Sequence, residues 1–209
     1  MYRLISATPS PYARKVRIAL IEKGVPFELV TEVPWNSDSE TPRFNPLEKL
    51  PVLITPHGES VFESRYVLEW IEIKHPEPPL APKGADDLLA MKRYEVIADG
   101  ACDALVLMFI ERSRAEPSPE WTARQKRKAD GALRDLAASI ETREFCVAGR
   151  LTYADLAVAS LLGWLRVRMP EYGWERTYPN LVAYTARLEA RPSFRDTQPA
   201  AQVIRDRVA

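Results

Sequence analysis

The stretch His75-Pro-Glu-Pro-Pro-Leu-Ala-Pro82 divides this chain of 209 residues into two unequal parts. Its four prolines cannot sit inside a helix, because proline lacks an N–H and its ring clashes with the preceding turn. Such a run is typical of a semi-rigid linker. We therefore predict a first domain over residues 1–76, a proline-rich linker over 77–85 and a second domain over 86–209.

The part before the linker alternates between strand and helix patterns. Pro11 to Lys23 is a predicted helix, with Ser10 as its N-cap, proline at its first position and Gly24 just past its end. A second helix is predicted over 64–74. Strand patterns occupy residues 3–6, 27–32, 51–54 and 60–62. The order is βαβ followed by ββα, which is an α/β domain.

The part after the linker has almost no strand pattern. Apolar residues recur every three or four positions between Leu88 and Phe109, as on one face of a long helix. Further helices are predicted over 119–142, 152–168 and 180–191. Thr152-Tyr-Ala-Asp155 is a capping box, and the residues after it are apolar on nearly every face, so this helix should be buried at the centre of an all-helical domain.

Composition excludes several classes of function. Lys and Arg total 29 and Asp and Glu total 29, which argues against nucleic acid or an acidic membrane surface as a partner. Two histidines, two distant cysteines and eight scattered glycines leave no HExxH, CxxC, GxGxxG or Walker motif. We therefore expect no metal and no nucleotide cofactor. No apolar segment is long enough to span a bilayer and no secretory signal is visible, so we expect a cytoplasmic protein.

Five short motifs, in the correct order, resemble the soluble glutathione transferases of the serine type, and most of all their less characterised bacterial members. They are Ser10-Pro-Tyr-Ala-Arg-Lys-Val-Arg-Ile-Ala-Leu20, Glu22-Lys-Gly-Val-Pro-Phe-Glu28, Asn45-Pro-Leu-Glu-Lys-Leu-Pro-Val-Leu53, Phe62-Glu-Ser64 and Thr152-Tyr-Ala-Asp155. The resemblance implies a thioredoxin-like first domain, glutathione as co-substrate, a role in detoxification and a homodimer.

Ser10 is the residue that the resemblance makes catalytic. Glutathione must lose its thiol proton to attack an electrophile, and a free thiol is only slightly ionised at neutral pH. A serine hydroxyl donating to the sulfur could supply about 1.5–3 kcal/mol, and the start of the helix up to about 1. The structural alternative is that Ser10 only caps the helix; Thr8 and Ser6 are the other candidate hydroxyls.

The resemblance also implies a glutathione-binding set. Pro51 would follow a cis peptide bond, so that the backbone of Leu50 pairs with the cysteinyl unit and Lys49 faces the glycyl carboxylate. Ser64 and the amides at its helix start would hold the glutamyl carboxylate, and Glu63 the ammonium; Ser64 could instead be a plain N-cap.

The electrophile pocket is the least determined part of the site. We expect it to be lined by Tyr12, Cys102, Val106 and Phe109, with Tyr94 of the same apolar stripe as a further candidate, although a stripe of this kind more often belongs to the core. Two other functions stay open: a non-catalytic binding protein of the same fold, and a zeta-like glutathione-dependent isomerase. The isomerases carry Ser-Ser-Cys where this chain has Ser10-Pro-Tyr12.

Overall fold

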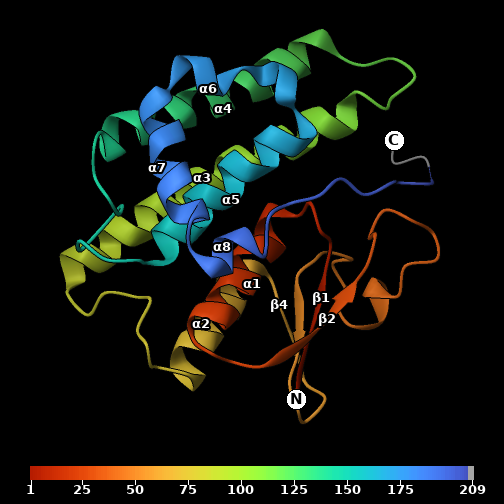
Figure 1. Ribbon diagram of the computed structural model, residues 1–209. Helices are drawn as coiled ribbons and strands as arrows, with labels where there is room; N and C mark the ends of the chain where they lie inside the picture. Colours follow the sequence, from red (N-terminus) through yellow and green to blue (C-terminus); the bar gives the residue numbers. More distant parts are fainter. Residues whose placement is uncertain (207–209) are drawn as a thin grey trace.

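The computed structural model describes residues 1–206, and Figure 1 shows a small sheet domain beside a larger bundle of helices. The sheet has the order β2-β1-β3-β4. β1 pairs in parallel with β2, with Tyr2 opposite Phe27, while β3 is antiparallel to both β1 and β4. The strands are β1 (Tyr2–Ser6), β2 (Phe27–Thr31), β3 (Val52–Ile54) and β4 (Ser60–Phe62). With α1 (Pro11–Glu22) and α2 (Ser64–Lys74), this confirms the predicted βαβ-ββα order.

The regular structure of the second domain is helical, and its described part contains no strand. Its helices are α3 (Ala85–Glu111), α4 (Pro119–Ile140), α5 (Tyr153–Arg168), α6 (Trp174–Thr177), α7 (Pro179–Glu189) and α8 (Pro192–Arg195). Two short 3-10 turns occupy Thr41–Arg43 and Pro170–Tyr172. Sequence patterns predicted the four long helices but not α6 and α8, because four residues are too few to show a period.

The buried central helix is confirmed. Every residue of α5 from Tyr153 to Leu165 is buried, and the capping box at Thr152 is complete. The Asp155 carboxylate accepts hydrogen bonds from the Thr152 N–H and the Cys146 N–H, both at 2.8 Å, and from the Tyr184 hydroxyl at 2.7 Å. One side chain therefore closes the start of α5 and joins it to α7.

Helix α1 docks the sheet domain on α5 through a fully buried arginine. The Arg14 guanidinium donates to the carbonyl oxygens of Ala159 (3.0 Å) and Phe194 (3.1 Å) and to Glu189 (2.7 Å). Gly163 makes room for it, since a Cβ there would lie 2.4 Å from Arg14 Nη1. Burial lowers the pKa of Arg14, and the Glu189 carboxylate opposes that shift.

After α8, the chain returns to the sheet domain as an irregular segment over residues 198–206, which Figure 1 shows crossing beside the loop that follows β2. The Thr8 hydroxyl donates to the Ala200 carbonyl at 3.0 Å. The Arg205 N–H donates to Asn36 Oδ1 at 3.0 Å, and its guanidinium pairs with Asp38 at 2.6 Å. The C-terminal segment thus borders the space between the domains. No sequence pattern indicated it.

Candidate functional site

A cavity of about 800 Å³ lies between the two domains, at the carboxyl end of β1. This volume is within the range of small-molecule sites. Its walls are the turn from β1 into α1, the loop before β3, the start of α2, one face of α3, the end of α5 and Ile204 of the C-terminal segment. The predicted site residues Ser10, Lys49, Leu50, Glu63 and Ser64 all line this cavity.

Ser10 lies where β1 passes into α1, and it is the predicted N-cap. Its Oγ accepts a hydrogen bond from the Ala13 N–H at 3.2 Å, and its own N–H donates to the Ala7 carbonyl at 3.1 Å. Within residues 1–206, the hydroxyl proton of Ser10 has no acceptor. Ser10 can therefore cap the helix and still donate to an atom in the cavity.

The other candidate hydroxyls point elsewhere. Ser6 is buried and donates to the Ala7 carbonyl, while the Thr8 hydroxyl is committed to Ala200. Tyr12 does line the cavity, but its hydroxyl donates to Asp103 Oδ1 at 2.5 Å. Burial raises the pKa of Tyr12, and Asp103 adds to the shift, so Tyr12 stays protonated at neutral pH. Among these hydroxyls, that of Ser10 is thus the one that lines the cavity and has no acceptor in the described chain.

The loop before β3 is held from within by a buried amide. Asn45 Nδ2 donates to the Lys49 carbonyl at 2.7 Å, and Asn45 Oδ1 accepts from the Leu47 N–H at 2.9 Å. The Leu50–Pro51 peptide bond is cis, as predicted. The N–H and carbonyl of Leu50 have no hydrogen-bond partner in the described chain, so both are available to a ligand. The Lys49 side chain is exposed at the rim.

The start of α2 differs from the structural alternative in which Ser64 is a plain N-cap. The cap is Glu63, which adopts a positive φ of 71°. Its carboxylate accepts from the N–H groups of Arg65 (3.2 Å) and Tyr66 (3.3 Å). Ser64 is instead the first helical residue, and its hydroxyl donates to Glu63 at 3.5 Å. Glu63 itself therefore occupies two of the amides at the start of α2, those of Arg65 and Tyr66, and leaves the Ser64 N–H without an acceptor in the described chain.

The cavity wall also contains a charged network that the sequence patterns did not predict. Asp99 of α3 accepts from Lys15 Nζ at 2.7 and 2.8 Å and from Arg65 Nε at 2.8 Å. Asp99 raises the pKa of Arg65. Asp99 is 34 residues from Arg65 in the chain, so no local motif could join them. A carboxylate beside the otherwise apolar stripe of α3 was the signal that could have drawn attention to it.

The apolar end of the cavity contains three of the four predicted pocket residues, Tyr12, Val106 and Phe109. Cys102 is not among the lining residues, which corrects the prediction. Its side chain turns into the core and is 2% exposed, one helical turn from Val106 on the buried face of α3. The cavity is also lined by residues that were not predicted to belong to the pocket, namely Trp35, Leu107, Ile110, Trp164, Arg168 and Ile204.

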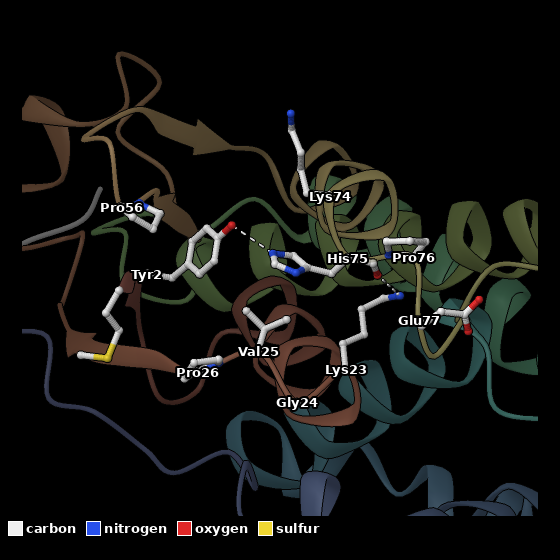
Figure 2. Close-up of a pocket in the computed structure, with 11 residues that line it drawn as sticks. Tyr2, Lys23, Gly24, Val25, Pro26, Pro56, Lys74, His75, Pro76 and Glu77 are labelled. Carbon is white, nitrogen blue, oxygen red and sulfur yellow. Dashed lines mark hydrogen bonds between the residues drawn. The ribbon is translucent and has the colours of Figure 1, made fainter.

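Figure 2 shows a second hollow, of about 570 Å³, at the opposite end of β1. The Tyr2 hydroxyl and His75 Nε2 are 3.0 Å apart in it. Lys23 Nζ donates to the His75 and Pro78 carbonyls at 2.8 Å and pairs with Glu72 at 2.7 Å. These polar groups bond to one another and are not presented to a ligand. The bonds of Lys23 connect the end of α1 to the end of α2.

Two further features of the described residues bear on cofactors and location. No group of three or more His, Cys, Asp or Glu side chains in residues 1–206 could hold a metal ion. Within the same residues, no helix is long and apolar enough to cross a membrane.

Comparisons with known proteins identify the relatives of this chain. Residues 4–79 match the family model of the glutathione S-transferase N-terminal domain, and residues 119–187 match that of the C-terminal domain. The uncharacterized GST-like protein YibF of Escherichia coli is 34% identical over 199 residues, which are 94% of this chain and 98% of that protein.

Two solved structures are similar over nearly their whole length. A glutathione S-transferase from Methylobacterium radiotolerans, in complex with glutathione sulfonate, is 58% identical with a TM-score of 0.97, covering 100% of this chain and 99% of that one. A glutathione S-transferase from Methylobacillus flagellatus with bound glutathione is 35% identical with a TM-score of 0.91, covering 96% and 100%.

Proposed function

Because the chain belongs to the glutathione S-transferase family, we propose that it transfers glutathione to a small electrophile, with the Ser10 hydroxyl stabilising the glutathione thiolate. The observation that carries this proposal is the hydroxyl proton of Ser10, which has no acceptor among residues 1–206 and lies at the start of α1, inside the cavity between the domains. Bound glutathione and glutathione sulfonate in the two similar structures support glutathione as the co-substrate.

The binding mode follows from the groups that line the sheet side of the cavity. The N–H and carbonyl of Leu50, beside cis-Pro51, would pair with the cysteinyl backbone of glutathione as a short added strand. Lys49 would face the glycyl carboxylate. Glu63 would accept the glutamyl ammonium, while Ser64 and the start of α2 would lie near the glutamyl carboxylate.

A homodimer is the proposed assembly. Tyr66 and Ile73 on α2, and Leu89 and Val96 on α3, are each more than half exposed. The Glu69–Lys92 ion pair, at 2.7 Å, places these helices side by side, so the four apolar side chains lie on neighbouring surfaces. A second copy of the chain would bury them, as expected for a two-fold interface.

The proposed location is the cytoplasm. Two free, buried cysteines are compatible with that reducing compartment.

The test is the ionisation of bound glutathione in wild type and in Ser10→Ala. Loss of a charge-assisted hydrogen bond of about 1.5–3 kcal/mol should raise the thiol pKa in the complex by about 1–2 units. Thiolate absorbance measured against pH gives that pKa, and turnover of a panel of halides, epoxides and enones gives the rate. Glutathione affinity should change only a few-fold.

Thr8→Ala is the matched control, since it removes a neighbouring hydroxyl that does not line the cavity. It should leave the thiol pKa unchanged. If wild type binds glutathione without lowering its thiol pKa, the proposed role of Ser10 is wrong. Binding without turnover of any electrophile would favour a non-catalytic protein of the same fold.

A further inference from the structure

The apolar end of the cavity contains one guanidinium group, that of Arg168 at the end of α5. It lies 5.0 Å from the centre of the Phe109 ring, which meets the Trp164 ring edge-on at 6.1 Å. Arg168 Nη2 donates to the Gln202 carbonyl of the C-terminal segment at 3.3 Å. The positive charge is thus held between the Phe109 ring and the C-terminal segment.

No carboxylate in residues 1–206 forms an ion pair with Arg168, unlike other arginines of the same region. Arg65 in the same cavity pairs with Asp99 at 2.8 Å, and Arg166 on the same helix pairs with Glu175 at 2.8 Å. A guanidinium has five N–H donors, and Arg168 uses one on the described chain. Burial lowers the pKa of Arg168, which means that its charge lacks full compensation.

Four acidic residues line the cavity, and none of them pairs with Arg168 in the described chain. Glu48 lies on the loop before β3, Glu63 caps α2, Asp99 is paired with two cations, and Asp103 accepts the Tyr12 hydroxyl. Arg168 can therefore attract an anionic group on a substrate at the apolar end. Planar, bidentate recognition of a carboxylate is the interaction that a free guanidinium favours.

We propose that Arg168 binds a carboxylate on the electrophile, so that the second substrate is an apolar or aromatic electrophile carrying a carboxylate group. This inference rests on the proposed function, and it adds the substrate class. For a chloromethyl electrophile, the glutathione sulfur forms a bond to the carbon that bears chlorine. The carbon–chlorine bond breaks, and chloride leaves with the bonding pair. Arg168 takes no part in these bond changes; it holds the carboxylate.

Binding of two matched conjugates tests this inference without any turnover. S-(4-carboxybenzyl)glutathione and S-(4-carbamoylbenzyl)glutathione differ in charge but hardly in shape. By calorimetry, wild type should bind the carboxylate about 10- to 100-fold more tightly than the amide, the range of one charge-assisted contact. Arg168→Met should abolish that preference, and Arg168→Lys should keep part of it.

Arg166→Met is the control variant, because Arg166 lies two residues away on α5, outside the cavity lining. It should leave the preference intact. Affinity for the amide conjugate reports whether a variant keeps its cavity wall. An equal loss for both conjugates in Arg168→Met would overturn the inference, as would equal binding of both by wild type.

Turnover separates this inference from the proposed function. With 4-(chloromethyl)benzoic acid and 4-(chloromethyl)benzamide, Arg168→Met should raise KM for the acid about tenfold or more and change KM for the amide less than threefold. If neither compound is conjugated but the carboxylate preference in binding depends on Arg168, the proposed transfer fails while the carboxylate site stands. If both compounds are conjugated and neither KM depends on Arg168, the proposed transfer stands and the carboxylate site is wrong.

Discussion

Replacing Gly163 of α5 by alanine should destabilise the protein, although alanine normally favours a helix over glycine by about 1 kcal/mol. The new Cβ would lie 2.4 Å from Arg14 Nη1 and 3.3 Å from a carbon of Pro199. Arg14 is fully buried and held by three hydrogen bonds, and its guanidinium must shift by about 1 Å to restore ordinary contact. That shift breaks the bond from Nη1 to the Ala159 carbonyl.

The expected cost follows from these two opposing effects. A lost charge-assisted hydrogen bond is worth about 1.5–3 kcal/mol, and it outweighs the helix gain by about 0.5–2 kcal/mol. Urea unfolding, followed by circular dichroism and tryptophan fluorescence, measures the difference as a lower midpoint at unchanged slope. Gly131→Ala on α4 is the control; nothing lies within 4 Å of its new Cβ, so it should be neutral or stabilising.

The same experiment in an Arg14→Lys background tests the cause. Lysine lacks the Nη1 atom that meets the new methyl group, so Gly163→Ala should cost less there than in wild type. The reasoning is refuted if Gly163→Ala stabilises the protein as much as Gly131→Ala does. An identical cost in both backgrounds would also contradict it.

Three further predictions concern charge and thiols. Although burial opposes its ionisation, hydrogen bonds from Arg191 and Ser193 hold the pKa of Glu22 below its ordinary 4.5. The ionised Glu22 carboxylate therefore stabilises the folded protein above pH 4.5, and this stabilisation is lost as the pH falls through the lower pKa of the folded state. Glu22→Gln should lower the melting temperature at neutral pH, and the melting temperatures of the variant and wild type should converge in acid. Burial raises the pKa of both Cys102 and Cys146, so iodoacetamide should modify neither thiol in the native protein at neutral pH and both in denaturant; rapid native labelling would contradict this. Lys49→Ala should weaken glutathione binding by no more than about fivefold, since exposed ion pairs contribute about 0.2–1 kcal/mol; calorimetry should find the difference smaller at high salt.

The parts of the fold that the sequence predicted are those with local causes. Ser10 and Pro11 begin α1 and Gly24 follows its end, while the Thr152–Asp155 box begins the helix that fills the core. These signals act within four residues, so one sequence suffices to find them. The cis bond before Pro51 came from resemblance, because the local base rate for such bonds is low.

The parts that escaped prediction depend on distant contacts. Asp99 meets Arg65 only after α2 and α3 pack together, and an apolar stripe cannot tell that Val106 faces the cavity while Cys102 faces the core. Glu63 caps α2 with a positive φ that non-glycine residues seldom adopt, so the sequence pointed to Ser64 and not to Glu63 as the alternative N-cap. Arg168 lines the cavity because α5, Phe109 of α3 and Gln202 of the C-terminal segment come together in the fold, and no spacing in the sequence predicts that contact.

The C-terminal segment has a consequence for how such proteins diversify. It places Ile204 in the cavity and a carbonyl against Arg168, yet it belongs to no helix or strand. Irregular segments tolerate insertions and substitutions far better than packed elements do. A lineage could therefore acquire selectivity for a new ligand by altering a few residues there, while Ser10, the sheet and the buried helix pass unchanged from ancestor to descendant.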